Sequence, residues 1–145
     1  MSYATLDQLR DRYGEALLVG LTDRGVNALG AIDQAVIDRA LADTDAVIDA
    51  RISGRYKIDA VRAALPPILV DIALCIAIWK LHRHEPSPKI KDDYADAIRQ
   101  LAALADGSAR LPLPDGDEPA GSGSTGARVT DRERPLTEQT LKGYI

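Results

Sequence analysis

One stretch of the chain, residues 68–81, is apolar on every side. Only Asp71 and Lys80 are polar among its fourteen residues. A helix that is apolar all round lies either in the centre of a bundle or inside a membrane. As a helix this stretch rises about 21 Å, which is short of the roughly 30 Å hydrocarbon core of a bilayer. Because Pro67 also suits a first helical turn, the pattern predicts a buried central helix over about residues 68–84.

Amphipathic patterns predict the helices that cover this one. Apolar residues recur at helical spacing on either side of Gly14, over residues 31–54 and over residues 87–107. Thr5 followed by Gln8 fits a capping box at the start of the first helix. The fold expected from the sequence is therefore all-α, a small helical bundle around the buried central helix.

Two connections lack an amphipathic helical pattern. Residues 22–30 are a loop by their Gly and Asn content, and they lack the glycine and the final Glu that an EF-hand calcium loop requires. The other connection begins with Arg55, Tyr56 and Lys57, and it could be extended with Tyr56 and Ile58 turned inward. It is either a loop that contacts a partner or a crossover strapped to the bundle.

The composition changes near the C-terminus. Residues 112–134 are rich in Gly, Ser and acidic side chains, which indicates a flexible linker, whereas residues 135–145 regain apolar side chains. The expected organisation is a helical domain over residues 1–111, followed by an extended flexible tail that ends in a docking peptide. The candidate docking residues of this peptide are Leu136, Leu141, Tyr144 and Ile145. A frayed terminus without function is the alternative.

Composition and charge limit the possible functions. The chain of 145 residues has a net charge of −4, so it lacks a global basic field that would attract nucleic acid. The single cysteine, Cys75, lies inside the apolar stretch, where we expect an inert small hydrophobic residue rather than a nucleophile. Residues 1–6 are neither basic nor strongly apolar, so we expect no signal peptide and an intracellular origin.

Acidic side chains on the long helix over residues 31–54 are a first candidate site. Asp45 and Asp49 are four residues apart and share one helix face, and Asp43 lies two residues before Asp45 on the same helix. No His or third carboxylate is fixed to that face by the helical spacing. We therefore interpret these residues as a solvated acidic face rather than a metal site or an acid–base pair.

Asp71, in the first turns of the central helix, is a second candidate. The helix dipole stabilises negative charge there, and an Arg from a neighbouring helix could pair with it. A structural ion pair is the first interpretation, and a catalytic acid, with Arg39 or Arg51 nearby, is the alternative. His82 and His84 are two residues apart and would point away from each other on a helix, so we expect no metal site there.

Motifs that would identify an enzyme are missing from the sequence. It has no P-loop, no G-x-G-x-x-G after a strand, no H-E-x-x-H and no Cys/His metal spacing. We therefore expect neither catalysis nor a bound cofactor. A DNA-binding regulator would need a recognition helix with a basic face, but the most basic stretches, residues 51–62 and 80–91, each straddle a helix break. The residues alone indicate a helical interaction module.

Several short motifs follow one another along nearly the whole chain. They are residues 3–9 (YATLDQL), 21–24 (LTDR), 31–33 (AID), 54–56 (GRY), 66–67 (PP), 71–73 (DIA) and 141–144 (LKGY). Each is short and non-catalytic, so specificity lies in their order and spacing. In this order they resemble the Mu-type head–tail connector, or neck adaptor, proteins of tailed phages.

The resemblance implies a structural virion protein, made in the cytoplasm of the host bacterium and located at the neck. Copies would form a dodecameric ring beneath the portal protein, extend the DNA channel and carry the stopper or tail-completion protein. Asp43, Asp45 and Asp49 would then be candidates for an acidic channel face past which double-stranded DNA slides without specific binding. No membrane partner is implied. The alternative function is a small intracellular helical DNA-binding regulator or another helical interaction module.

Deletion of residues 136–145 tests the docking peptide. We expect the truncated protein to bind its neighbours or the portal protein more weakly, because a tethered peptide adds avidity through its high effective concentration. Sedimentation of the truncated and full-length proteins with the portal protein measures the effect. An unchanged complex would show that the tail is dispensable.

Overall fold

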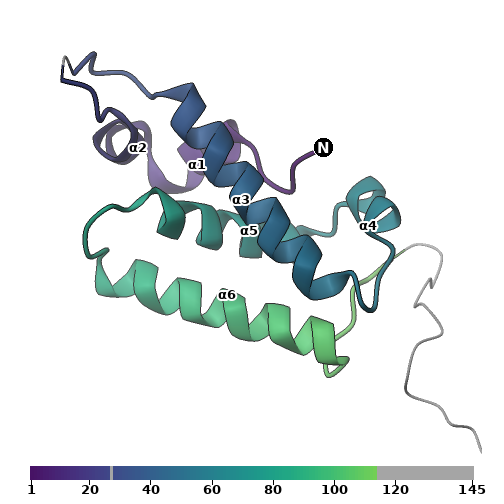
Figure 1. The fold of residues 1–145 in the computed structure, drawn as a ribbon. Helices are drawn as coiled ribbons and strands as arrows, with labels where there is room; N and C mark the ends of the chain where they lie inside the picture. The colour runs from purple at the N-terminus through teal and green to yellow at the C-terminus, as the bar shows by residue number, and fades with distance from the viewer. Residues whose placement is uncertain (27, 114–145) are drawn as a thin grey trace, which may run out of the picture.

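A computed structural model describes residues 1–26 and 28–113 (Figure 1). Its regular secondary structure is entirely helical: α1 (Leu6–Tyr13), α2 (Glu15–Thr22), α3 (Gln34–Ile52), α4 (Ile58–Ala64), α5 (Pro67–Leu81) and α6 (Pro88–Asp106). The predicted all-α bundle is confirmed. The predicted docking residues Leu136, Leu141, Tyr144 and Ile145, and all but the first two residues of the predicted linker, lie outside the described residues.

Helix α5 is the centre of the bundle, as the apolar stretch predicted. It packs against α3, α6 and α1, and every residue from Ile72 to Ile78 is buried (Figure 1). The helix ends at Leu81, three residues before the predicted end. His82 takes an extended backbone conformation, and its ring lies 2.7 Å, Nδ1 to oxygen, from the Ile78 carbonyl. The polar residues after Leu81 therefore leave the core instead of continuing the helix.

Capping groups set the ends of the surrounding helices. The capping box of Thr5 and Gln8 is present, and Gly14, with φ of +84°, separates α1 from α2. Helix α3 begins at Gln34 rather than Ala31, because the Asp33 carboxylate accepts hydrogen bonds from the first free backbone N–H groups of the helix. Helix α6 runs from Pro88 to the left-handed Gly107, close to the predicted bounds.

The connection after α3 is not extended, contrary to one expectation from the sequence. Helix α4 forms there, with Val61 buried and Ile58 half-buried. These two residues are three positions apart, so one turn of helix places their side chains on the same side. The helix ends at Leu65, which is left-handed with φ of 42°, because the following Pro66 disfavours a right-handed helical residue before it.

The described chain after α6 packs back on the bundle. Leu111 is buried, and its backbone N–H donates to the Tyr56 hydroxyl at 3.3 Å. Ala109 and Leu113 also pack against the core. The last described residues are therefore held at the end of the bundle where α3 ends and α4 begins (Figure 1).

No single helix within residues 1–26 and 28–113 is long and apolar enough to cross a membrane. Helices α4 and α5 have the length and apolar composition of a membrane-crossing segment only when they are taken together. They are bent by 98° at the break between them.

Replacement of Ile76 by alanine tests the role of α5. Ile76 is 1% exposed, so we expect a loss of about 2–5 kcal/mol in the free energy of unfolding from lost burial and the cavity left behind. Ile68→Ala is the matched control, because Ile68 lies on the same helix and is 37% exposed; its expected loss is below about 1 kcal/mol. Urea denaturation measures both, and equal losses would contradict the central position of α5.

Candidate functional site

Two of the three predicted acidic-face residues bind groups within the chain. Asp45 Oδ1 accepts hydrogen bonds from Ser2 Oγ and Tyr3 N, both at 3.1 Å. Asp49 accepts the Tyr3 hydroxyl at 2.7 Å on Oδ1 and the Arg62 guanidinium at 2.5 Å on Oδ2. We call these five residues the N-terminal clamp. They join the N-terminus and α4 to α3.

The aromatic ring of Tyr3 is the core of the N-terminal clamp. Tyr3 is fully buried, and the Arg62 guanidinium carbon lies 5.2 Å from its ring centroid, within the range of a cation–π contact. Burial and the hydrogen bond to Asp49 raise the pKa of Tyr3, whereas the Asp49 carboxylate also raises the pKa of Arg62. Tyr3 therefore acts as a neutral hydrogen-bond donor to an ion pair.

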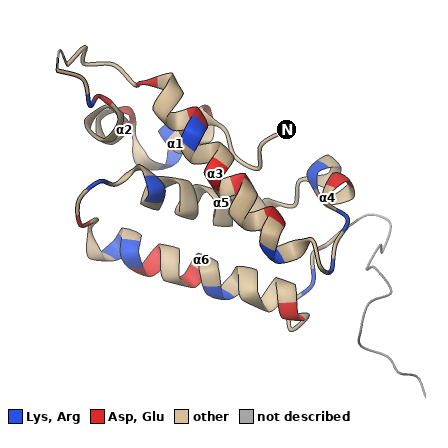
Figure 2. Cartoon of the chain, in the orientation of Figure 1, with Lys and Arg blue, Asp and Glu red and all other residues tan. Residues whose placement is uncertain are grey.

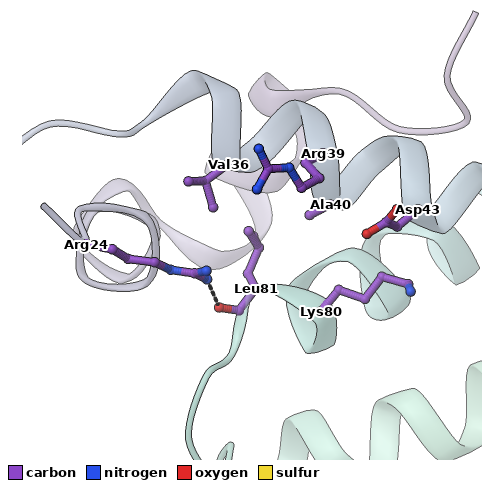
Figure 3. Close-up of a pocket in the computed structure, with 7 residues that line it drawn as sticks. All are labelled: Arg24, Val36, Arg39, Ala40, Asp43, Lys80 and Leu81. Carbon is purple, nitrogen blue, oxygen red and sulfur yellow. Dashed lines mark hydrogen bonds between the residues drawn. The ribbon is translucent and has the colours of Figure 1, made fainter.

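Asp43, the third predicted residue, lies on a different part of the surface. It is exposed and makes no hydrogen bond or ion pair with another described residue. Figure 3 shows it at the edge of a hollow of about 90 Å³ between α3 and the end of α5. The structure thus separates Asp43 from Asp45 and Asp49 in environment, although all three lie on α3. Their assignment to a DNA channel stays a prediction.

The hollow beside Asp43 is predominantly basic. We call it the basic hollow; it is lined by Arg24, Val36, Arg39, Ala40, Asp43, Lys80 and Leu81 (Figure 3). Arg24 is fixed there, because its guanidinium donates to the carbonyls of Leu21 at 2.7 Å and Leu81 at 2.6 Å. These bonds join the turn after α2 to the end of α5.

A second hollow of about 230 Å³ adjoins the first. Arg24 and Leu81 line both, and the second is completed by Gly20, Leu21, Asp23, His82, Arg83 and His84. Positive side chains thus gather at one end of a chain whose net charge is negative.

The basic hollow has no signature in the sequence. Arg24, Arg39 and Lys80 come from the turn after α2, from α3 and from α5, far apart along the chain. They meet only because α3 packs on α5 and Arg24 caps the end of α5. A search for basic stretches finds Lys80 at the start of residues 80–91, but it cannot find Arg24 and Arg39, which each follow an acidic residue.

The predicted contact residues Arg55, Tyr56 and Lys57 have different environments. Tyr56 is 2% exposed and belongs to the core, so it is unavailable for docking in this fold. Arg55 is half-buried against Gly107, where a side chain would collide with its guanidinium. Only Lys57, at the start of α4, is exposed. Whether this connection contacts a partner or only crosses the end of the bundle stays a prediction.

Asp71 has the arginine partner that the sequence suggested. Arg12 of α1 forms an ion pair with its carboxylate and also donates to the Cys75 sulfur at 3.6 Å. Burial raises the pKa of the Cys75 thiol, which keeps it protonated. The partner is neither Arg39 nor Arg51, the two residues considered for a catalytic site with Asp71.

The interior of the described bundle holds two polar side chains. The hydroxyls of Thr22 and Thr44 each donate at 2.7 Å to the carbonyl four residues earlier, those of Leu18 and Ala40. Within the described part of the chain, no group of three or more His, Cys, Asp or Glu side chains could hold a metal ion.

Comparison with known proteins assigns the chain to a family. The family model for bacteriophage Mu Gp36 matches residues 3–130. Gene product J of Escherichia phage Mu is 30% identical over 146 residues, which cover all of both chains. The Mu-like prophage FluMu protein gp36 of Haemophilus influenzae is 30% identical over 115 residues, 79% of each chain.

The chain belongs to the bacteriophage Mu Gp36 family. The resemblance to a Mu-type phage family is therefore confirmed, and the chain is a phage-related protein. The family match covers all six helices, the basic hollow and every residue of the N-terminal clamp except Ser2, and it continues beyond the last described residue.

Replacement of Tyr3 by phenylalanine tests the N-terminal clamp in this Gp36-family protein. We expect a loss of about 1–3 kcal/mol in the free energy of unfolding, because Asp49 loses a hydrogen-bond donor. Tyr94→Phe is the matched control: Tyr94 stacks on Trp79 with ring centroids 4.6 Å apart, and its hydroxyl donates to no other described residue. Urea denaturation measures both variants, and an equal effect would contradict the clamp.

The raised pKa of Tyr3 also predicts a dependence on pH. The folded state holds the phenol proton more tightly than the unfolded state, so this stability is fully present below the unfolded pKa of about 10 and is lost above it. We expect wild type to lose stability between neutral pH and pH 11 more steeply than Tyr3→Phe. Parallel losses for the two proteins would show that Tyr3 titrates normally.

Proposed function

We propose that this phage protein is a head–tail connector, a structural and non-catalytic component of the virion neck. Copies form a ring beneath the portal protein, extend the DNA channel and provide the platform for the stopper or tail-completion protein. The protein is made in the cytoplasm of the host bacterium, and it needs no cofactor for this role.

The proposal rests mainly on the family match over residues 3–130. The order of short motifs along the chain, which resembles that of Mu-type neck adaptors, also supports it. The fold is consistent with an assembly role, because the core is filled by the apolar faces of its own helices. Figure 2 shows charged residues of both signs along α3 and α6, the two long helices that pack on α5. A regulator that reads DNA is less well supported, because the basic hollow is built from three separate elements rather than one recognition helix.

Of the three candidate residues for the channel face, Asp43 is better placed than Asp45 and Asp49 to face passing DNA. Asp45 and Asp49 are held in the N-terminal clamp, whereas Asp43 is exposed. A carboxylate that faces the channel from the edge of the basic hollow repels phosphate and offsets part of the attraction of Arg39 and Lys80 beside it. In the proposed ring, passing DNA is thus a non-specific partner that slides past Asp43.

An assembly experiment tests the proposed function. The gene for this chain is inactivated in the phage or prophage that encodes it, and the particles are separated by density and imaged. We expect DNA-filled heads and free tails, which join to give infectious particles when purified full-length protein is added. Empty heads, or complete particles without the protein, would contradict a connector that acts after DNA packaging.

Replacement of Asp43 tests its place in the channel. We expect Asp43→Lys to slow DNA ejection more than Asp43→Asn, because a cation binds phosphate whereas an amide only removes the repulsion. Both variants should keep the wild-type free energy of unfolding, since Asp43 has no partner among the described residues. Ejection is followed by the fluorescence of a DNA dye, and wild-type rates in both variants would place Asp43 outside the channel.

A further inference from the structure

The cations around the basic hollow lack carboxylate partners. Elsewhere on the surface, basic residues of α1, α4 and α6 form ion pairs with acidic ones: Arg10, Arg12, Arg62, Lys89 and Arg99. By contrast, Arg39, Lys80 and Arg83 form no ion pair with another described residue, and Arg24 donates only to carbonyl groups. Unpaired cations gathered around a hollow are an electrostatic site for an anionic ligand.

The chain itself contains an acidic segment of matching charge. Residues 115–118 read Asp-Gly-Asp-Glu and carry three carboxylates within four positions, directly after the described domain. The two adjoining hollows carry four cations, Arg24, Arg39, Lys80 and Arg83, against the two carboxylates of Asp23 and Asp43. The segment and the hollows are therefore complementary in charge.

The described chain ends at the other end of the bundle from its own basic hollow. Leu111 is bonded to Tyr56, just after the C-terminal end of α3, whereas Arg39 lies in the second turn of that helix. The residues of α3 between Arg39 and Ile52 rise about 20 Å. An extended chain covers at most about 3.6 Å per residue, so the acidic segment reaches at most about 18 Å from Leu113 at Glu118, and only about 7 Å at Asp115. The segment cannot lie across its own basic hollow.

We propose that residues 115–118 of one copy bind in the basic hollow of a second copy. The contact joins opposite ends of two bundles and is therefore heterologous, the kind of interface that closes into a ring when its rotation permits. This inference rests on the proposed ring and names a contact between its neighbours. The contact itself involves only two copies, so it can be detected whether or not the portal protein binds.

Zero-length carbodiimide cross-linking tests the contact directly. A mixture of ¹⁵N-labelled and unlabelled full-length protein is cross-linked, and the joined peptides are identified by mass spectrometry. We expect amide bonds between Lys80 and the carboxylates of residues 115–118, in pairs that combine the two isotopes. The internal control is Lys89 with Asp93, 2.9 Å apart on α6, which should be linked within one isotope.

Charge reversal provides a second, independent test. Arg39→Glu with Lys80→Glu is expected to weaken self-association by about tenfold or more, because like charges then face each other. Reversal of the segment, Asp115→Lys with Asp117→Lys and Glu118→Lys, should do the same, and a mixture of the two variants should associate again. The matched control is Arg51→Glu with Arg99→Glu, which changes the net charge equally on exposed positions away from the hollow.

Three outcomes would overturn the proposal. The first is a linked control pair without any link between Lys80 and residues 115–118. The second is such a link within single-isotope chains only, which would mean that the segment folds back on its own copy. The third is salt-dependent binding of double-stranded DNA that is lost on reversal of Arg39 and Lys80 without any change in self-association. A confirmed contact without a ring on the portal would leave this inference standing and contradict the proposed function instead.

Discussion

The constraint on which the structure depends is that α5 has no side suited to water. The run from Ile72 to Ile78 is buried at every position, so α5 must be covered on all faces over that run, and burial of those side chains is the main favourable term in folding. Helices α3 and α6, each 19 residues long, are long enough to cover it from end to end, and α1 completes the cover. The outer faces of these helices form the surface of the bundle.

Polar side chains fix how the covering elements sit on this apolar core. Arg12 ties α1 to Asp71, Arg24 ties the turn after α2 to the end of α5, and Asp49 ties the N-terminus and α4 to α3. Each tie lies at the margin of the core, where partial burial strengthens a hydrogen bond and the ends of the groups stay near water. Several charges that resemble a solvated face in the sequence therefore hold the fold together.

The sequence predicted what depends on local pattern and missed what depends on packing. The central helix, the capping box of Thr5 and the start of α6 follow from apolar spacing and from residues that satisfy helix ends. Helix α4 was missed because seven residues with two apolar anchors also suit an extended crossover. The N-terminal clamp and the basic hollow join side chains from different elements, so their composition is set by tertiary packing and cannot be read from any window of the chain.

Electron microscopy of the full-length protein with the portal protein of the same genome, together with the native mass of the complex, tests the central claim most directly. The account predicts a ring of copies seated coaxially on the portal, with a mass that is a whole number of chains above that of the portal alone. A protein that stays a monomer or dimer and leaves the portal unoccupied would contradict the connector function.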